Sequence, residues 1–210
     1  MPATLHIPGP LTIEVETPGG LATFTLPDAL VIAQPPETET QWAYPVGSEE
    51  FPTTMWKCDQ YHLWSKANPD GHTGIDLNGD KAPYGDIDRG QPIWAIADGV
   101  VHDRGHSDGW LGVIVVKHQH DGADLYVRYA HLDPQTFQVE IGDHVNAGDL
   151  LGKLGDYRGG DTGDHLHFDM CLDKMTWSEF KTQGKRWVDP VPVLKAHLQP
   201  AVIDQMLKKD

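Results

Sequence analysis

The chain contains no apolar run that approaches the roughly 20 residues a helix needs to span a bilayer. Basic residues are also missing from its start, since the first of them is Lys57. A Sec signal peptide opens with a positively charged region, and Pro2, Pro8 and Pro10 further interrupt this segment. We therefore expect neither a membrane span nor a Sec signal peptide.

Positive charge is scarce along the whole chain. It has 16 Lys and Arg residues but 31 Asp and Glu residues, which gives a net charge of −15. A surface of this sign repels phosphate groups, which argues against nucleic acid and anionic membranes as partners. Cysteine is nearly absent as well. Cys58 and Cys171 leave open either one disulfide or two thiols, and their spacing does not indicate a metal site.

The chain has no His-Glu-x-x-His sequence, which excludes the commonest helical zinc-peptidase arrangement. Histidine is nevertheless abundant, and His165 and His167 flank a single leucine. Because side chains alternate along a strand, both imidazoles can enter one site. His72 and Asp76 likewise share one face of an extended segment. Two histidines and a carboxylate are the ligand number and type of a catalytic zinc that keeps its fourth position open for water.

Five sequence blocks between Gly71 and Pro190 resemble, in content and order, the lysostaphin-type or LytM-like zinc metallopeptidases that cut peptide cross-links in bacterial cell walls. The blocks are His72 to Asp76, Trp94 to Val101, Tyr129 to Leu132, Ile141 to Gly152 and Thr162 to Asp169. The resemblance implies an all-β fold, a mostly antiparallel sheet with a zinc-containing groove, to which we add a short C-terminal helix.

The resemblance also implies a role for each polar position in these blocks. His72, Asp76 and His167 would hold one zinc ion per chain, while His131 and His165 would be the catalytic histidines. One imidazole would accept a proton from water, and the other would steady the oxyanion or protonate the leaving amine. Which histidine does which stays open.

The sequence departs from the family pattern in two places. The loop that usually reads Ser-Thr-Gly-Pro-His has Asp161 in place of the serine and Asp164 in place of the proline, and Asp169 stands where the family has glutamate. We expect both departures to flank the substrate groove without touching a metal ligand, and so to bear on specificity.

The chain is expected to have three parts. Residues 1–40 form a β-hairpin, in which Leu11, Ile13 and Val15 alternate with polar residues, and a proline-containing linker, as a docking or delivery segment. Residues 41–198 form the peptidase domain. Residues 199–210 carry Ile203 and Met206 at helical spacing and form the C-terminal helix.

Other motifs favour plain structural roles. His118 and His120 share the spacing of the pair at 165 and 167, but they follow the apolar run 113–116 and precede an Asp-Gly turn. We therefore expect the exposed end of a strand, hairpin-paired with residues 125–129. Residues 141–152 have a rhythm that also occurs in lipoyl and biotinyl carrier domains. Those domains need a modifiable lysine, which is missing here, so the segment is interpreted as a structural hairpin.

The resemblance implies metal-assisted hydrolysis of an amide bond in peptidoglycan stem peptides or cross-bridges. The family cuts both Gly-Gly bridges and D-Ala–diaminopimelate cross-links. We find no wall-targeting module in this sequence, and this favours a D,D-endopeptidase acting on a thin, periplasmic wall. The rival is a non-catalytic LytM-like protein that binds and activates a murein amidase. Such proteins have lost zinc ligands, whereas all five polar positions are present here.

Delivery is the remaining question that the sequence raises. A wall enzyme without a Sec signal peptide would reach the periplasm or cell exterior by phage, through a holin, or by injection. We therefore expect a phage lysin or a secreted antibacterial effector. A delivery apparatus and an inhibitor or immunity protein are the expected protein partners.

Overall fold

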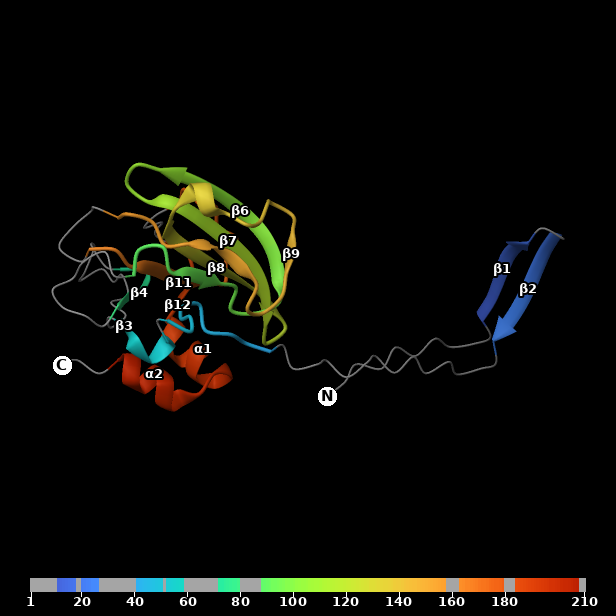
Figure 1. The fold of residues 1–210 in the computed structure, drawn as a ribbon. Helices are drawn as coiled ribbons and strands as arrows, with labels where there is room; N and C mark the ends of the chain where they lie inside the picture. Colours follow the sequence, from blue (N-terminus) through green and yellow to red (C-terminus); the bar gives the residue numbers. More distant parts are fainter. Residues whose placement is uncertain are drawn as a thin grey trace. The chain divides into compact units, whose positions relative to one another are not determined.

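The computed structural model describes residues 11–17, 20–26, 41–50, 52–58, 72–79, 88–157, 163–179 and 184–207. The chain divides into two compact units, residues 1–40 and 41–210 (Figure 1). In the first unit, β1 (Leu11–Thr17) pairs antiparallel with β2 (Gly20–Leu26). The hairpin expected from the alternating pattern is confirmed, while the linker that follows lies outside the described residues.

A sheet of eight strands forms the framework of the second unit, and all its strand pairs are antiparallel. In spatial order its strands are β3 (Trp56–Cys58), β4 (Gly74–Gly79), β11 (Leu166–Cys171), β8 (Ala123–Leu132), β7 (Leu111–His120), β6 (Gly99–Ser107) and β9 (His144–Val145), with β12 (Trp187–Val188) beside the end of β11. The hairpin predicted around the Asp-Gly turn is confirmed as β7 and β8. The mostly antiparallel fold is therefore confirmed.

Smaller elements complete this unit. Strands β5 (Pro92–Trp94) and β10 (Leu150–Lys153) pair antiparallel, and two 3-10 turns, η1 and η2, cover Thr53–Met55 and Pro134–Thr136. The chain ends in α1 (Pro190–His197) and α2 (Pro200–Met206). The expected helix corresponds to α2, whereas α1 was not expected. Two of the first three residues of α1 are prolines, which favoured an extended chain at this point. The N–H groups of a helix's first turn have no partner within the helix, however, so proline is tolerated there. Asp189 caps the helix by accepting a hydrogen bond from the Val191 N–H at 2.9 Å.

The interpretation of residues 141–152 as one hairpin is wrong. This segment, which the structure describes throughout, contains β9 and the start of β10, but β9 pairs with β6 and β10 pairs with β5. The segment therefore connects two sheets. Its glycines supply the turns: Gly142 and Gly148 both adopt positive φ, which costs little without a Cβ.

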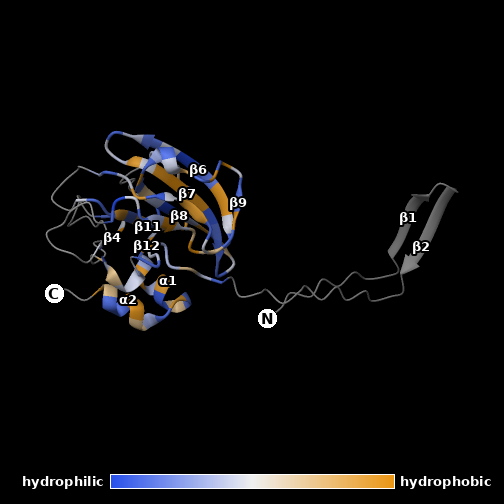
Figure 2. Ribbon diagram, in the orientation of Figure 1, coloured by the Kyte–Doolittle hydropathy of each residue, from blue (hydrophilic) through white to orange (hydrophobic). Residues whose placement is uncertain are grey.

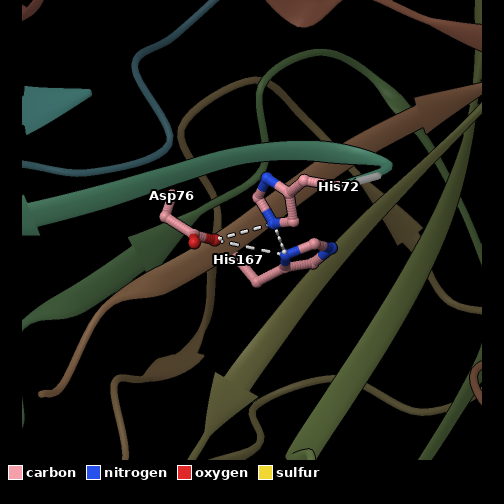
Figure 3. A group of neighbouring side chains, drawn as sticks. All are labelled: His72, Asp76 and His167. Carbon is pink, nitrogen blue, oxygen red and sulfur yellow. Dashed lines mark hydrogen bonds and ion pairs between the residues drawn. The ribbon is translucent and has the colours of Figure 1, made fainter. Parts of the chain in front are cut away.

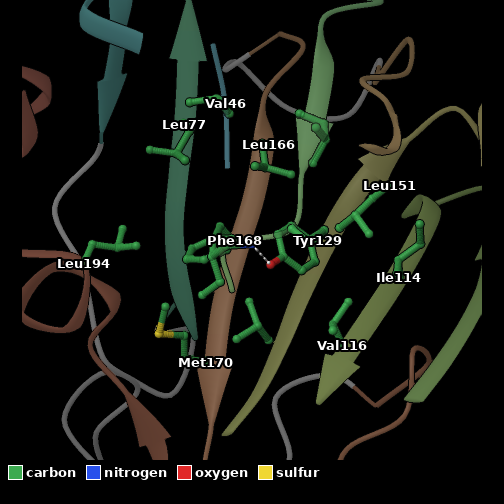
Figure 4. Packing of buried hydrophobic residues seen from close by; sticks show 14 of the residues in the cluster. Val46, Leu77, Ile114, Val116, Tyr129, Leu151, Leu166, Phe168, Met170 and Leu194 are labelled. Atoms are coloured by element: carbon green, nitrogen blue, oxygen red, sulfur yellow. Dashed lines mark hydrogen bonds between the residues drawn. The ribbon is translucent and has the colours of Figure 1, made fainter. Parts of the chain in front are cut away.

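The hydrophobic core lies on one face of the central strands. Leu166, Phe168 and Met170 point from β11 into this core, where Phe168 packs edge-on against Tyr129 at 5.4 Å between ring centroids (Figure 4). Strands β7 and β8 carry the longest hydrophobic stretches (Figure 2). Because side chains alternate, the intervening residues of β11, His167 and Asp169, face the other side of the sheet.

The two cysteines, left open by the sequence, are both buried thiols and are not joined in a disulfide. Cys58 packs into the main core, whereas Cys171 belongs to a second, smaller cluster on the opposite face of the sheet. Trp177 and Trp187 cover that second cluster. Trp177 and Trp187 therefore pack against the same side of the sheet as His167.

Candidate metal centre and catalytic histidines

Strands β4 and β11 bring three polar side chains together. Asp76 and His167 are direct partners in the antiparallel register, and His72 lies just before β4. The buried neighbours Ile75 and Leu77 point into the core, so Asp76 faces the opposite side, as the alternation predicts. The three side chains point toward one another (Figure 3).

The geometry of these three side chains suits a metal ion. The Nε2 atom of His72 lies 2.8 Å from the Nδ1 atom of His167, and the Oδ1 atom of Asp76 lies 3.2 Å from each nitrogen. All three ligand atoms fall within 4.8 Å of one another. In the part of the chain that the structure describes, no other group of three potential ligands comes this close. Two imidazole nitrogens and one carboxylate oxygen are a donor set that fits catalytic zinc.

The charges of this cluster favour an ionised Asp76. Burial alone raises the pKa of its carboxyl group, but hydrogen bonds with His167 and His72 and the positive charge of the histidines bring that pKa below its usual range. The carboxylate is therefore ready to accept a cation at neutral pH. Without a metal, a protonated His167 can supply positive charge beside Asp76. Burial lowers the pKa of His167, but hydrogen bonds to Asp169 and Asp76 raise it overall.

His131 and His165 form a second pair beside the three ligand candidates. Their ring centroids are 4.6 Å apart, and the Nε2 atom of His165 lies 3.6 Å from the Oδ1 atom of Asp76. The Nδ1 atom of His131 lies 3.2 Å from the carbonyl oxygen of Trp110, and that of His165 lies 3.0 Å from the carbonyl oxygen of Gly163. A neutral imidazole that donates from Nδ1 has an unprotonated Nε2, which can accept a proton.

The surroundings keep both imidazoles neutral. Burial, and to a lesser extent the neighbouring titratable groups of His165 and His167, lowers the pKa of His131 to about 2. Burial also lowers the pKa of His165, although the charge of Asp76 opposes this. A general base must be unprotonated to work, so both residues are in the required state at neutral pH. His131 also has a positive φ of 68°, a conformation that a non-glycine residue rarely adopts without a specific need.

Tyr157 completes the surroundings of the histidine pair, and no motif in the sequence pointed to it. Its ring stacks on His131 at 3.8 Å between centroids and an interplanar angle of 27°, and meets His165 edge-on at 5.0 Å. The buried Asp164 anchors it, because one carboxylate oxygen accepts from the Tyr157 backbone N–H at 2.6 Å. The other oxygen accepts from Nε of Arg89 at 3.0 Å. Asp164 therefore ties two loops together beside the histidine pair.

The contacts of Asp169 differ from the expectation. The expectation that it would touch no ligand is wrong, because its Oδ2 atom lies 3.0 Å from the Nε2 atom of His167. The side chain is fully buried and forms an ion pair with Arg128. It could not be placed from sequence alone, because its partner Arg128 is 41 positions away and is brought opposite to it only by the β8–β11 register.

The histidines at 118 and 120 lie away from these five residues. The expectation of an exposed strand end is wrong for His118, which is buried, with its Nδ1 atom 3.0 Å from the carbonyl oxygen of Asp98. Burial lowers the pKa of His118 to about 4. His120 instead contacts His197, the two ring nitrogens being 3.3 Å apart.

Residues 70–178, just over half of the chain, match the family Peptidase family M23. The chain belongs to peptidase family M23. The resemblance to lysostaphin-type and LytM-like peptidases that the five blocks carry is thereby confirmed. M23 peptidases are zinc metallopeptidases, and His72, Asp76 and His167 of this M23 chain offer a donor set that fits zinc.

Several known proteins are similar to this M23 chain. The DD-carboxypeptidase/endopeptidase Mpg of Neisseria meningitidis serogroup B is 35% identical over 102 residues, which cover 49% of this chain and 20% of Mpg. The glycyl-glycine endopeptidase ALE-1 of Staphylococcus capitis is 31% identical over 129 residues, which cover 61% of this chain and 30% of ALE-1. The chain thus matches less than a third of the length of either relative.

A solution structure of lysostaphin has the same fold, with a TM-score of 0.51 and 24% identity, over 73% of this chain and 55% of that one. This M23 chain contains, among its described residues, no helix long and apolar enough to cross a membrane.

Proposed function

We propose that this M23 chain is a zinc-dependent endopeptidase that hydrolyses peptide cross-links of bacterial peptidoglycan. One observation carries the proposal: three zinc-type ligand atoms lie within 4.8 Å of one another, next to two buried imidazoles with lowered pKa values. A non-catalytic member of the family has no need for this combination. The same combination is what metal-assisted hydrolysis of an amide bond requires.

The roles of the residues follow from their positions. His72, Asp76 and His167 would hold the zinc ion, which when bound would supply Lewis-acid chemistry at the scissile carbonyl and at water. His131 and His165 present their Nε2 atoms, because each Nδ1 atom faces a backbone carbonyl. One of them accepts a proton from the attacking water, and the other stabilises the oxyanion or protonates the leaving amine.

A D,D-endopeptidase activity on D-Ala–diaminopimelate cross-links is the favoured specificity. The name of the relative Mpg denotes DD-carboxypeptidase and endopeptidase activity, whereas ALE-1 is named for glycyl-glycine cleavage. We favour the first because Mpg is 35% identical to this chain against 31% for ALE-1, and a further relative, ShyC of Vibrio cholerae, is named a peptidoglycan DD-endopeptidase. The protein would then act on a thin wall, in the periplasm or outside the cell.

We further propose a phage lysin or a secreted antibacterial effector, with residues 1–40 as a docking or delivery segment. These residues form a unit of their own, and every candidate site residue lies in the other unit. A delivery apparatus is the partner that such a segment would contact. An inhibitor or immunity protein would protect a cell that produces the enzyme.

A muropeptide digest tests this proposal. The purified zinc-loaded chain is incubated with isolated murein of a Gram-negative wall and, separately, with murein cross-linked by pentaglycine. Mass spectrometry of the released fragments identifies the new ends. We expect D-Ala termini and free diaminopimelate amino groups from the first substrate. Release only in the presence of an added murein amidase would instead support the non-catalytic activator.

A further inference from the structure

The fully buried carboxylate of Asp169 contacts three side chains behind the candidate metal centre. A single oxygen, Oδ2, lies 3.0 Å from Nε2 of His167 and accepts a hydrogen bond from Oγ1 of Thr73 at 2.8 Å. The same oxygen pairs with the Nη2 group of Arg128. These contacts come from three neighbouring strands or their ends, because Asp169 lies opposite both Gly74 and Arg128 in the sheet register.

This contact has a consequence for the chemistry of His167. A carboxylate can only accept hydrogen bonds, so the neutral imidazole must carry its proton on Nε2. The Nδ1 atom then presents its lone pair toward Asp76 and His72. That is the tautomer a metal ligand needs. The other tautomer would point an N–H group into the ligand cluster and repel a cation.

Arg128 carries the charge that keeps Asp169 ionised at this depth. Neither side chain is exposed to solvent. The guanidinium group also donates from Nη1 to the carbonyl oxygen of Glu179 and lies between the rings of Trp110, at 5.2 Å, and Trp187, at 5.6 Å. A buried charge is tolerated when it is paired and hydrogen-bonded in this way. The segment 177–187 supplies two of these contacts.

Trp110 connects the Arg128 guanidinium group to His131, because the Trp110 ring contacts both. The Trp110 ring stacks on His131 at 5.3 Å and meets His167 edge-on at 5.1 Å. Its carbonyl oxygen accepts from the His131 backbone N–H at 3.2 Å and faces Nδ1 of the same residue. These contacts hold His131 in its left-handed backbone conformation, which a histidine adopts only when its surroundings impose it.

We propose that the Arg128–Asp169 pair is the positioning device of the site: it fixes the tautomer and ring orientation of His167 and, through Trp110, the placement of His131. The inference rests on the proposed zinc-binding role of His167. Both side chains are fully buried, and Asp169 contacts the site through His167, so both are positioning residues. A buried ion pair with a purely structural role would affect stability but leave the tautomer and the metal affinity unchanged.

The test uses the full chain, zinc alone as the probe, and three measurements: zinc affinity by chelator competition, thermal stability of the metal-free protein, and the His167 tautomer from long-range 1H–15N spectra. The key variant is Asp169→Asn, whose amide can donate to Nε2 and so reverse the tautomer. Met170→Ala is the matched control, because it is the next residue of β11, equally buried, and faces the opposite side. Arg128→Lys keeps the charge but loses the planar group between the two tryptophans.

We expect Asp169→Asn to weaken zinc binding by roughly 10- to 100-fold, the usual effect of removing a group that orients a metal-binding histidine. We also expect its His167 to move to the Nδ1–H tautomer. Arg128→Lys should weaken zinc binding to a lesser degree. Asp169→Glu introduces the family residue and should retain most of the wild-type zinc affinity. Met170→Ala should lower the melting temperature with zinc affinity within about twofold of the wild type.

Zinc affinity of Asp169→Asn within twofold of the wild type, or a neutral wild-type His167 that carries its proton on Nδ1 instead of Nε2, would overturn the proposal. If Asp169→Asn fails to fold, Thr73→Val and Arg128→Lys give the same readouts, and unchanged zinc affinity in both would overturn it as well. Failure of the proposed function looks different, because the wild-type chain itself would then bind no zinc or cleave no murein.

Discussion

The Nε2 atom of His72 and the Nδ1 atom of His167 lie 2.8 Å apart, although 95 positions separate the two residues in the chain. Antiparallel pairing of β4 and β11 creates this proximity, since it places Asp76 directly opposite His167. The two imidazole nitrogens, with the carboxylate of Asp76 as the third donor, would hold one zinc ion.

The first prediction concerns this ligand set. Replacing His72, Asp76 or His167 with Ala should reduce the zinc content from about one ion per chain to near zero, because two remaining protein ligands hold zinc poorly. Elemental analysis of the purified variants measures this directly. The matched control is His118→Gln, which removes another buried histidine of the same sheet. Loss of zinc from the control, with retention in His167→Ala, would show that the ligand set is wrong.

A second prediction concerns Asp164, which holds Tyr157 against the histidine pair. Asp164→Ala removes the acceptor for the Tyr157 N–H and the ion pair with Arg89. We expect kcat on a cross-linked muropeptide to fall about tenfold, the scale of one hydrogen bond to a charged group, while zinc content stays unchanged. Asp173→Ala, which removes a partly exposed carboxylate paired with Arg186, is the control. Equal kcat values for Asp164→Ala and the wild type would refute the role of this contact.

The third prediction is a pH dependence of stability at His118. Its pKa is lowered from 6.5 to about 4 in the folded chain, chiefly by burial. Between these two pH values the unfolded chain binds a proton that the folded chain does not, so stability falls as pH decreases through this window. The loss should approach about 3 kcal/mol at the lower end. Denaturant unfolding at several pH values measures it.

His118→Gln should flatten the plot of unfolding free energy against pH between pH 6.5 and 4, because glutamine does not titrate. The difference in unfolding free energy at pH 7 gives the effect of the substitution that does not depend on pH. His106→Gln, a change at an exposed position of β6, should leave the slope unchanged. An identical slope for the wild type and His118→Gln between pH 6.5 and 4 would show that His118 does not titrate as described.

The fourth prediction tests the delivery role of residues 1–40. These residues form a separate unit and contain no candidate site residue. Deleting them should leave hydrolysis of isolated murein within about twofold of the full chain but abolish lysis in an assay that requires delivery. Loss of folding in the shortened chain would contradict this role. A clear rise in murein hydrolysis would instead indicate that the segment covers the site.

Local patterns were enough to predict part of this molecule. The alternation around Asp76 and His167, the Asp-Gly turn between β7 and β8, and the helical spacing of Ile203 and Met206 each concern neighbours in sequence. Their structural outcome follows from the two-residue period of a strand and the 3.6-residue period of a helix. The resemblance then added the histidine at 131, which no local pattern distinguishes from the other histidines.

The contacts around the site could not be predicted, because they depend on register and on burial. Asp169 meets Arg128, and Asp164 meets Arg89, only after distant strands or loops come together. His118 looked exposed because polar residues follow it, yet the bend of the chain at Asp98 covers it. Helix α1 was missed because prolines that break a helix interior are tolerated in its first turn.

The measurement that tests the central claim most directly compares zinc content with turnover in variants of the two catalytic histidines. His165→Ala and His131→Asn are suitable, since asparagine tolerates the left-handed backbone of residue 131 better than alanine does. Both variants should retain about one zinc ion per chain, while murein turnover falls roughly 100- to 10,000-fold, as expected for a lost general acid or base. Near-normal turnover in either variant, or loss of zinc from His165→Ala with retention in His167→Ala, would contradict the account.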